Sequence, residues 1–141
     1  MTRSRNKRSG QALVEGSLIM LVFVVVLIGI ADFGQFLYLH QSLTERVRAA
    51  ARYGAVHTYS DSGSAIKKVA VYNDAAAADG AAPLVPNLTT DMVTATLDDA
   101  GTDSARITVT ITSYPFNFIS PYMSKDTFYR TVLATEPYEI P

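Results

Sequence analysis

The longest apolar run of the chain lies close to its N-terminus. Residues 17–31 read SLIMLVFVVVLIGIA and are apolar everywhere except Ser17 and Gly29. A helix over the uncharged stretch between Glu15 and Asp32 rises about 24 Å, and the apolar residues after Asp32 bring it to the ~30 Å of a hydrocarbon core. The run therefore predicts a membrane-spanning helix and excludes a plain soluble globular chain. The side chains expected along this span are Leu18, Ile19, Leu21, Phe23, Val25, Leu27 and Ile30.

The helical pattern continues beyond this span as a single apolar stripe. Its members recur at intervals of three or four residues. They are Phe36, Leu39, Leu43, Val47 and Ala50. Because the first proline is Pro83, we expect one helix from Gln11 to about Val56, about 69 Å long, with Gly54 as a possible stop. The second half of this helix is then an amphipathic stalk that must pack on another element.

The rest of the chain predicts one short helix followed by strands. Residues 61–64 offer an N-cap for a helix with Ile66, Val69 and Ala70 on its apolar face, and Gly80 is the expected residue after its end. From residue 91 the period changes to two. This pattern predicts strands at 93–97 and 107–112 joined by a hairpin, a loop over 114–126, and a third strand at 128–134.

Strands with apolar residues on one face need a helix to cover that face, and the stalk is the obvious cover. We therefore expect an α+β fold, in which a long N-terminal helix packs on a small three-stranded antiparallel sheet with one short extra helix. The expected divisions are a basic leader (1–10), the membrane-spanning half of the helix (11–40), the stalk (41–60) and an outer α+β domain (61–141).

Charge is distributed unevenly along the 141 residues. Arg3, Arg5, Lys7 and Arg8 precede the apolar run, whereas the whole chain has 12 Lys and Arg against 13 Asp and Glu. The positive-inside rule keeps the N-terminus in the cytoplasm and places the later residues outside the inner membrane. Positive charge confined to a short tail argues against a nucleic-acid binder. Since the chain has no Cys, disulfides, zinc–cysteine clusters and thiol nucleophiles are excluded.

No residue pattern in the chain points to an enzyme or a cofactor. The two histidines, His40 and His57, lie in no catalytic or metal-binding motif, and we expect no metal site. Asp98, Asp99 and Asp103 faintly suggest a calcium loop but fit a solvated hairpin turn better. Four aromatic residues could form either packing at the rim of the domain or a ligand platform. They are Tyr114, Phe116, Phe118 and Tyr122.

Three interpretations compete for the N-terminal segment. A secretory signal could be cut after Gly29-Ile30-Ala31, which would release a binding domain. An uncut segment would be a single-pass anchor. The third interpretation depends on residues 9–15, just before the apolar run, because a lone acid such as Glu15 is costly in the first turns of a membrane helix and usually has a purpose. The helical stripe continues past Ala31 without a break, which argues against an ordinary signal peptide.

Three stretches of the chain are similar to a known family. They are RSGQALVE at residues 8–15, ADFGQ at 31–35 and RAAARYGA at 48–55. Together they resemble the TadE-like minor pilins (pseudopilins) of the tight-adherence, or Flp, pilus system, within the type IV pilin superfamily. The resemblance implies cleavage by a prepilin peptidase between Gly10 and Gln11, which makes Glu15 the fifth mature residue. One departure is Gly16, where Tad-type pilins usually carry Phe or Tyr.

This resemblance implies a structural, non-enzymatic subunit that assembles or primes a pilus. Its partners would be other pilins, the prepilin peptidase and the inner-membrane assembly platform, with no nucleic acid and no small-molecule substrate, and it could reach the cell surface in the pilus. Glu15 would pair with the Gln11 amine of a neighbouring subunit and fix the register of the filament. The alternatives are a Glu15 that simply reaches water at the interface, an uncleaved scaffold of the same system, and a domain secreted after Ala31.

Overall fold

The computed structural model describes residues 5–78, 80–116, 118–120 and 131–139. Its helices are α1 (Arg5–Ala55) and α2 (Ser64–Tyr72), and its strands are β1 (Val93–Asp98), β2 (Arg106–Ile111) and β3 (Val132–Pro137). Two short 3-10 turns, η1 (Asp61–Gly63) and η2 (Thr90–Met92), precede α2 and β1. The expected α+β fold is confirmed: a long apolar N-terminal helix packs on a three-stranded antiparallel sheet with one short helix.

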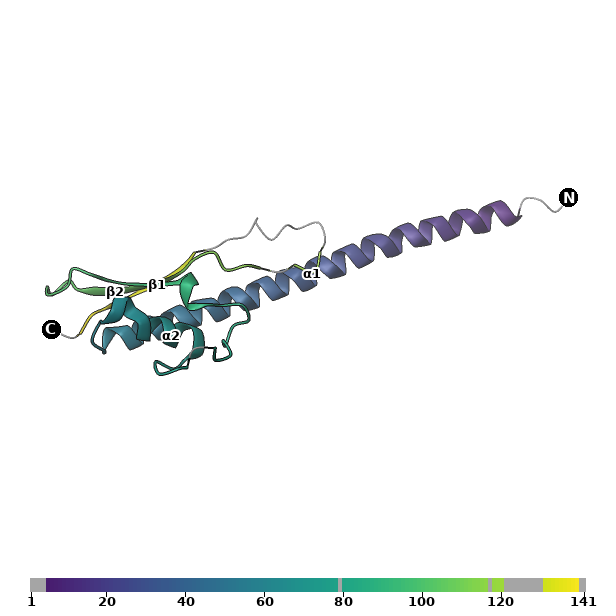
Figure 1. Ribbon diagram of the computed structural model, residues 1–141. Helices are drawn as coiled ribbons and strands as arrows, with labels where there is room; N and C mark the ends of the chain where they lie inside the picture. The colour runs from purple at the N-terminus through teal and green to yellow at the C-terminus, as the bar shows by residue number, and fades with distance from the viewer. Residues whose placement is uncertain (1–4, 79, 117, 121–130, 140–141) are drawn as a thin grey trace.

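Helix α1 is continuous over 51 residues. Its first half projects alone, and its second half lies against the sheet and α2, so that the start of α1 and the end of β3 lie at opposite ends of the molecule (Figure 1). We call the second half of α1, α2 and the strands together the C-terminal domain. The backbone N–H of Glu139 donates to the Ala55 carbonyl at 3.0 Å. The last described residue of the chain thus satisfies a carbonyl that the end of a helix leaves without an intrahelical partner.

The sheet has the order β1-β2-β3, and both pairs are antiparallel. Ile111 of the central strand pairs with Val93 on one side and with Val132 on the other. The alternating pattern of β2 places Ile107, Val109 and Ile111 in the interior. Helix α1 packs against β2 and β3, and α2 lies beside α1 and reaches β1, so the fold has one helical layer and one sheet layer (Figure 1).

One hydrophobic core joins the two layers. The stalk supplies Leu43, Val47 and Ala50 to it, and Phe36 and Leu39 pack at its edge. Residues separated by three or four positions lie on the same helical face, which is why this stripe turns as a unit toward the sheet. The core residues contributed by the other elements include Ile66, Val69, Val71, Val93, Ile107, Val109 and Ile111.

Helix α2 ends earlier than the sequence pattern predicts. It stops at Tyr72, and Asn73 takes a left-handed conformation (φ 59°) while its N–H donates to the Val69 carbonyl at 2.9 Å. The prediction of Gly80 as the residue after the helix was wrong, because Asn also tolerates this conformation and was available first. At the N-terminus of α2 the cap residue is Gly63, which has a left-handed φ of 73° and no side chain that could cap the helix.

The third strand lies later in the chain than predicted. It spans Val132–Pro137 in place of 128–134, and residues 128–130 lie outside the described part of the chain. The strand extends to Pro137 because β3 pairs with β2 as far as Arg106. Since β3 is an edge strand, a proline at its end removes no hydrogen bond from the interior of the sheet.

Candidate functional site

The expected cleavage position lies inside the first turns of α1. Because the helix begins at Arg5, Gly10 and Gln11 are helical, and both are exposed. A Cβ placed on Gly10 would meet no atom within 4 Å. Within the described part of the chain, no other segment therefore covers Gly10 or Gln11.

Glu15 faces solvent one turn after Gln11. The Gln11 side-chain amide Nε2 donates to Oε1 of Glu15 at 3.3 Å, as expected for residues four apart on a helix. Both side chains are exposed. The geometry brings the two predicted assembly residues together within one chain, and whether they pair between subunits stays a prediction.

The apolar run of α1 has no cover within the described part of the chain. All the side chains predicted to line the span are exposed: Leu18, Ile19, Leu21, Phe23, Val25, Leu27 and Ile30. The helix is long and apolar enough to cross a membrane, and none of its most apolar 18-residue window is buried in the fold. An apolar surface of this extent marks a site of contact with lipid or with other proteins.

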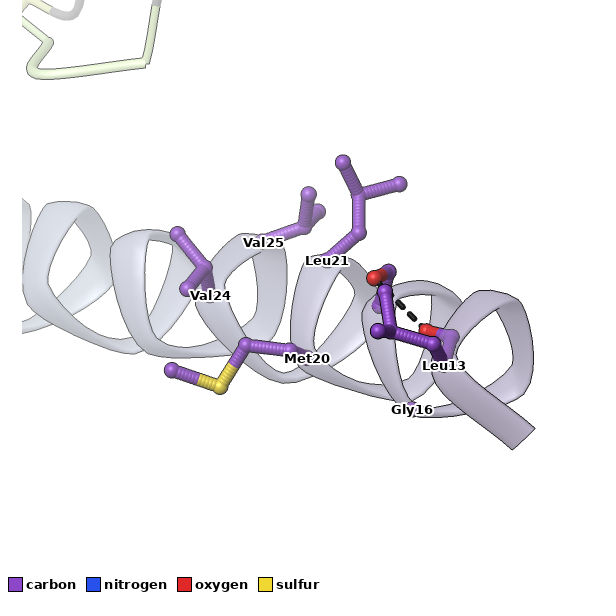
Figure 2. A pocket seen from close by; sticks show the side chains of 7 residues that line it. Leu13, Gly16, Met20, Leu21, Val24 and Val25 are labelled. Atoms are coloured by element: carbon purple, nitrogen blue, oxygen red, sulfur yellow. Dashed lines mark hydrogen bonds between the residues drawn. The ribbon is translucent and has the colours of Figure 1, made fainter. Parts of the chain in front are cut away.

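A shallow apolar groove runs along this exposed segment beside Gly16 (Figure 2). Ser17 adds little polarity to it, because its hydroxyl donates to the Leu13 carbonyl at 2.8 Å. Gly16 has no side chain, and a Cβ there would meet no atom within 4 Å. The departure from Phe or Tyr at this position thus leaves one face of the helix open. The groove is lined by Leu13, Gly16, Ser17, Met20, Leu21, Val24 and Val25.

Asp32 ends the apolar run, and it is buried, with only 3% of its surface exposed. Its Oδ1 accepts a hydrogen bond from the backbone N–H of Ile119 at 2.6 Å, and its Oδ2 accepts one from Ser120 at 2.9 Å. A buried carboxylate is costly unless it is hydrogen-bonded, and these two backbone donors meet that need. In the sequence Asp32 stands out only as the acid that follows the uncharged stretch, and this contact was not predicted. The one available signal was an acid directly after a long apolar run.

Aromatic packing continues from Asp32 toward the sheet. The rings of Phe36 and Phe116 lie 5.0 Å apart between centroids, and Tyr114 meets Phe116 edge-on at 5.3 Å. The Tyr114 hydroxyl donates to the Pro86 carbonyl at 2.7 Å, and burial raises the pKa of this phenol above its usual value of 10.0. Tyr114 and Phe116 are therefore core packing and do not form a ligand platform, whereas Tyr122 lies outside the described residues.

The remaining candidates for chemistry are the two histidines and the turn between β1 and β2. His40 stacks on Phe36 of this aromatic packing, and the ring of His57 stacks on Tyr53 at 3.8 Å. Asp98 accepts a hydrogen bond from the Thr108 hydroxyl at 3.3 Å, at the start of the turn between β1 and β2. Among the residues that the structure describes, no group of three or more His, Asp or Glu side chains could hold a metal ion.

Residues 10–52 match the family model of TadE-like proteins. This match confirms the resemblance found in the sequence and is consistent with a protein associated with the tight-adherence pilus. The TadE-like segment begins at Gly10, includes Glu15 and Asp32, and ends just before the end of α1. Comparisons with curated proteins and with solved structures give no match.

Proposed function

We propose that the chain is a structural subunit, a minor pilin or pseudopilin, that assembles or primes a tight-adherence-type pilus from the inner membrane. The observation that carries this proposal is the exposed apolar half of α1 within the TadE-like segment. Its apolar side chains find no cover in the described fold. Lipid covers them before assembly, and helices of neighbouring subunits replace the lipid during assembly. The function of the chain is accordingly structural and not enzymatic.

The partners follow from the same surface. Other pilins and the inner-membrane assembly platform bind the apolar half of α1. The basic residues ahead of it, including Arg5, Lys7 and Arg8, keep the N-terminus in the cytoplasm, so the C-terminal domain lies outside the membrane. That domain then presents its sheet and loops to the neighbouring outer domains of the filament.

Processing by a prepilin peptidase between Gly10 and Gln11 precedes assembly. The exposure of both residues and the open space around Gly10 support this step. Helix ends open readily, and glycine lowers helix stability by about 1 kcal/mol relative to alanine. The few residues of α1 before Gly10 can therefore unwind into an extended substrate. The new amine at Gln11 lies one turn from the Glu15 carboxylate.

The test is the N-terminal sequence of the protein in membranes of its native host. We expect the mature chain to begin at Gln11 and to remain in the membrane fraction. Gly10→Leu should block maturation, whereas Gly16→Leu should not, although a Cβ has equally open space at both positions. A mature chain that begins at Asp32 would contradict the proposal and favour a secreted domain.

An uncleaved scaffold of the same assembly system is the second candidate. The observation that fits it is the unbroken course of α1, which begins at Arg5 and passes through Gly10 without interruption. This candidate predicts that the protein in mature membranes retains its leader and that Gly10→Leu has no effect. The same mapping of the N-terminus separates the two candidates.

A further inference from the structure

The C-terminal domain reaches along α1 as far as Asp32. Within the part of α1 whose side chains are described, those from Gly10 to Ala31 are exposed apart from the half-buried Ile28, and Asp32 is buried. The hydrogen bonds from Ile119 and Ser120 to its carboxylate hold the segment after Phe118 at this level of the helix. Asp32 therefore marks the edge of the domain that faces the span.

The length of the exposed segment matches the thickness of a bilayer. Residues 11–31 rise about 31 Å at ~1.5 Å per residue, close to the ~30 Å hydrocarbon core. A boundary near residue 40 would draw the irregular backbone at residues 118–120 into hydrocarbon. Irregular backbone is not found exposed to lipid at that depth. The length of the exposed segment and the position of residues 118–120 thus favour an end of the hydrocarbon core at Asp32.

The side chains at this edge are apolar and exposed. Phe33, Leu37 and Ile119 are 63%, 48% and 62% exposed. Neither residues 33–44 nor residues 113–120 contain Asp, Glu, Lys or Arg. The edge is thus an uncharged continuation of the apolar span, although it belongs to a folded domain. Tyr38, at 71% exposure, adds an aromatic ring with a polar tip of the kind found at membrane interfaces.

We propose that this edge of the C-terminal domain, formed by Phe33, Leu37, Tyr38 and Ile119, docks on the lipid interface of the outer leaflet. The proposal rests on the membrane insertion of α1 proposed above. The Asp32 carboxylate serves as a positioning group: it fixes the backbone of Ile119 at the level of the boundary, and its own charge is shielded from lipid by the two N–H donors.

A planar partner suits this edge better than a second helix does. Leu37 and Tyr38 are successive residues and project about 100° apart around α1. Ile119 comes from a different segment and lies at the level of Asp32, about one and a half turns before Leu37 and Tyr38. Exposed side chains that surround a helix within two turns fit a flat interface, whereas one partner helix would contact a single stripe along α1.

The chain contains no tryptophan, so single introduced tryptophans report depth in the membrane. We would reconstitute the full chain in phosphatidylcholine vesicles whose acyl chains carry bromine either near the headgroup or near the chain end. The variants are Ile119→Trp at the edge, Leu133→Trp as the matched control, and Phe23→Trp within the span. Ile119 and Leu133 are both 62% exposed, but Leu133 lies on β3.

We expect bromine near the headgroup to quench the tryptophan at position 119 about threefold more than that at position 133, as an interfacial aromatic residue requires. Bromine near the chain end should quench the tryptophan at position 23 most. Adding Asp32→Ala should abolish the difference between positions 119 and 133 and leave position 23 unchanged. Phe33→Trp provides a second reporter at the edge that does not depend on the segment held by Asp32.

The outcomes separate this inference from the proposed function. If position 23 is quenched while positions 119 and 33 behave like position 133, the edge does not contact lipid and the inference is overturned alone. If position 23 is not quenched either, α1 is not inserted and both proposals fail. A blue-shifted but unquenched tryptophan at position 119 would indicate cover by a second copy of the chain, which also overturns the lipid contact.

Discussion

A Cβ atom added to Gly54 would lie 2.8 Å from Cδ1 of Ile66, so α1 and α2 approach each other at a glycine. The same Cβ would lie 3.0 Å from Cγ2 of Ile107 on the central strand. Ile66 could rotate its terminal methyl group away, but the branched Ile107 side chain is stiff and fully buried. Gly54 thus permits both helices and the sheet to meet at one point, and α1 ends at the next residue, Ala55.

Gly54→Ala should therefore destabilise the C-terminal domain even though alanine favours helix. Overpacking costs about 1–3 kcal/mol, whereas the gain in helix propensity is about 1 kcal/mol, so we expect a net loss of about 1 kcal/mol. Urea unfolding of a fragment comprising residues 31–141 measures the change. Gly34→Ala is the matched control, since a Cβ there meets no atom within 4 Å and should raise stability slightly. Equal effects of the two substitutions would contradict the close approach.

We expect the folding of such fragments to depend on whether they contain the stalk. A chain that begins at Ala31 keeps Asp32 and the stalk, and it should unfold cooperatively. A chain that begins after Val56 lacks Leu43, Val47 and Ala50, which the structure buries against the sheet. It exposes the apolar face of the sheet and should aggregate. Sedimentation and thermal unfolding compare the two, and a soluble, cooperative shorter fragment would show that the stalk is dispensable for the core.

Asp32→Ala should lower the stability of the same fragment by about 2 kcal/mol or more, because hydrogen bonds to charged groups contribute about 1.5–3 kcal/mol each. The substitution leaves the N–H groups of Ile119 and Ser120 without this acceptor. Asp103→Ala is the control, since Asp103 is exposed at the turn between β1 and β2 and should change stability little. Hydrogen exchange of the Ile119 and Ser120 amides should accelerate only in the Asp32 variant. Unchanged exchange would show that the carboxylate does not hold this segment.

Tyr114 makes the stability of the domain depend on pH in the alkaline range. Burial raises the pKa of Tyr114 above its usual value, so the phenol loses its proton at a lower pH in the unfolded chain than in the folded chain. The stabilisation from the neutral phenol is complete below about pH 10 and is lost as the pH rises through the folded-state pKa. Tyr114→Phe should remove this component of the alkaline loss, at a cost of about 1 kcal/mol at neutral pH from the missing hydrogen bond to Pro86. Urea unfolding from pH 7 to 11 compares the slopes, and identical slopes would contradict the prediction.

Periodicity was enough to predict the architecture of the chain. The three-to-four spacing of Leu43, Val47 and Ala50 and the alternation around Val109 specify buried faces directly, because each period corresponds to one type of secondary structure. The bounds of the helices and strands were harder to predict. Asn73 ends α2 through a left-handed conformation that glycine also adopts, and the sequence pattern does not show whether Asn73 or Gly80 ends the helix.

The junction between span and domain could not be predicted for a different reason. The hydrogen bond between Asp32 and Ile119 joins residues 87 positions apart, and no local spacing encodes such a contact. An acidic residue after an apolar run predicts the end of a membrane span whether or not its carboxylate accepts a hydrogen bond from a distant segment. The roles of Gly10, Gln11 and Glu15 are likewise not determined by folding alone, because these residues are exposed and their partners would be other molecules.

Glu15 therefore provides the sharpest test of assembly, since replacing it leaves the described fold intact. The described structure gives its carboxylate one hydrogen bond, from the Gln11 side chain, and the residue is exposed. A charged residue costs about 2.5–3.5 kcal/mol at mid-bilayer and less near the interface, so Glu15→Leu should insert at least as well as the wild type. If Glu15 merely reaches water, this variant should also assemble normally. If Glu15 pairs with the Gln11 amine of a neighbour, the variant should be inserted and cut at Gly10 but fail to co-purify with the other pilins, and surface pili counted by electron microscopy should disappear.

Glu15→Asp keeps the charge on a shorter side chain and should retain part of the assembly, which separates loss of charge from loss of reach. Wild-type numbers of pili in Glu15→Leu would remove Glu15 from the assembly residues.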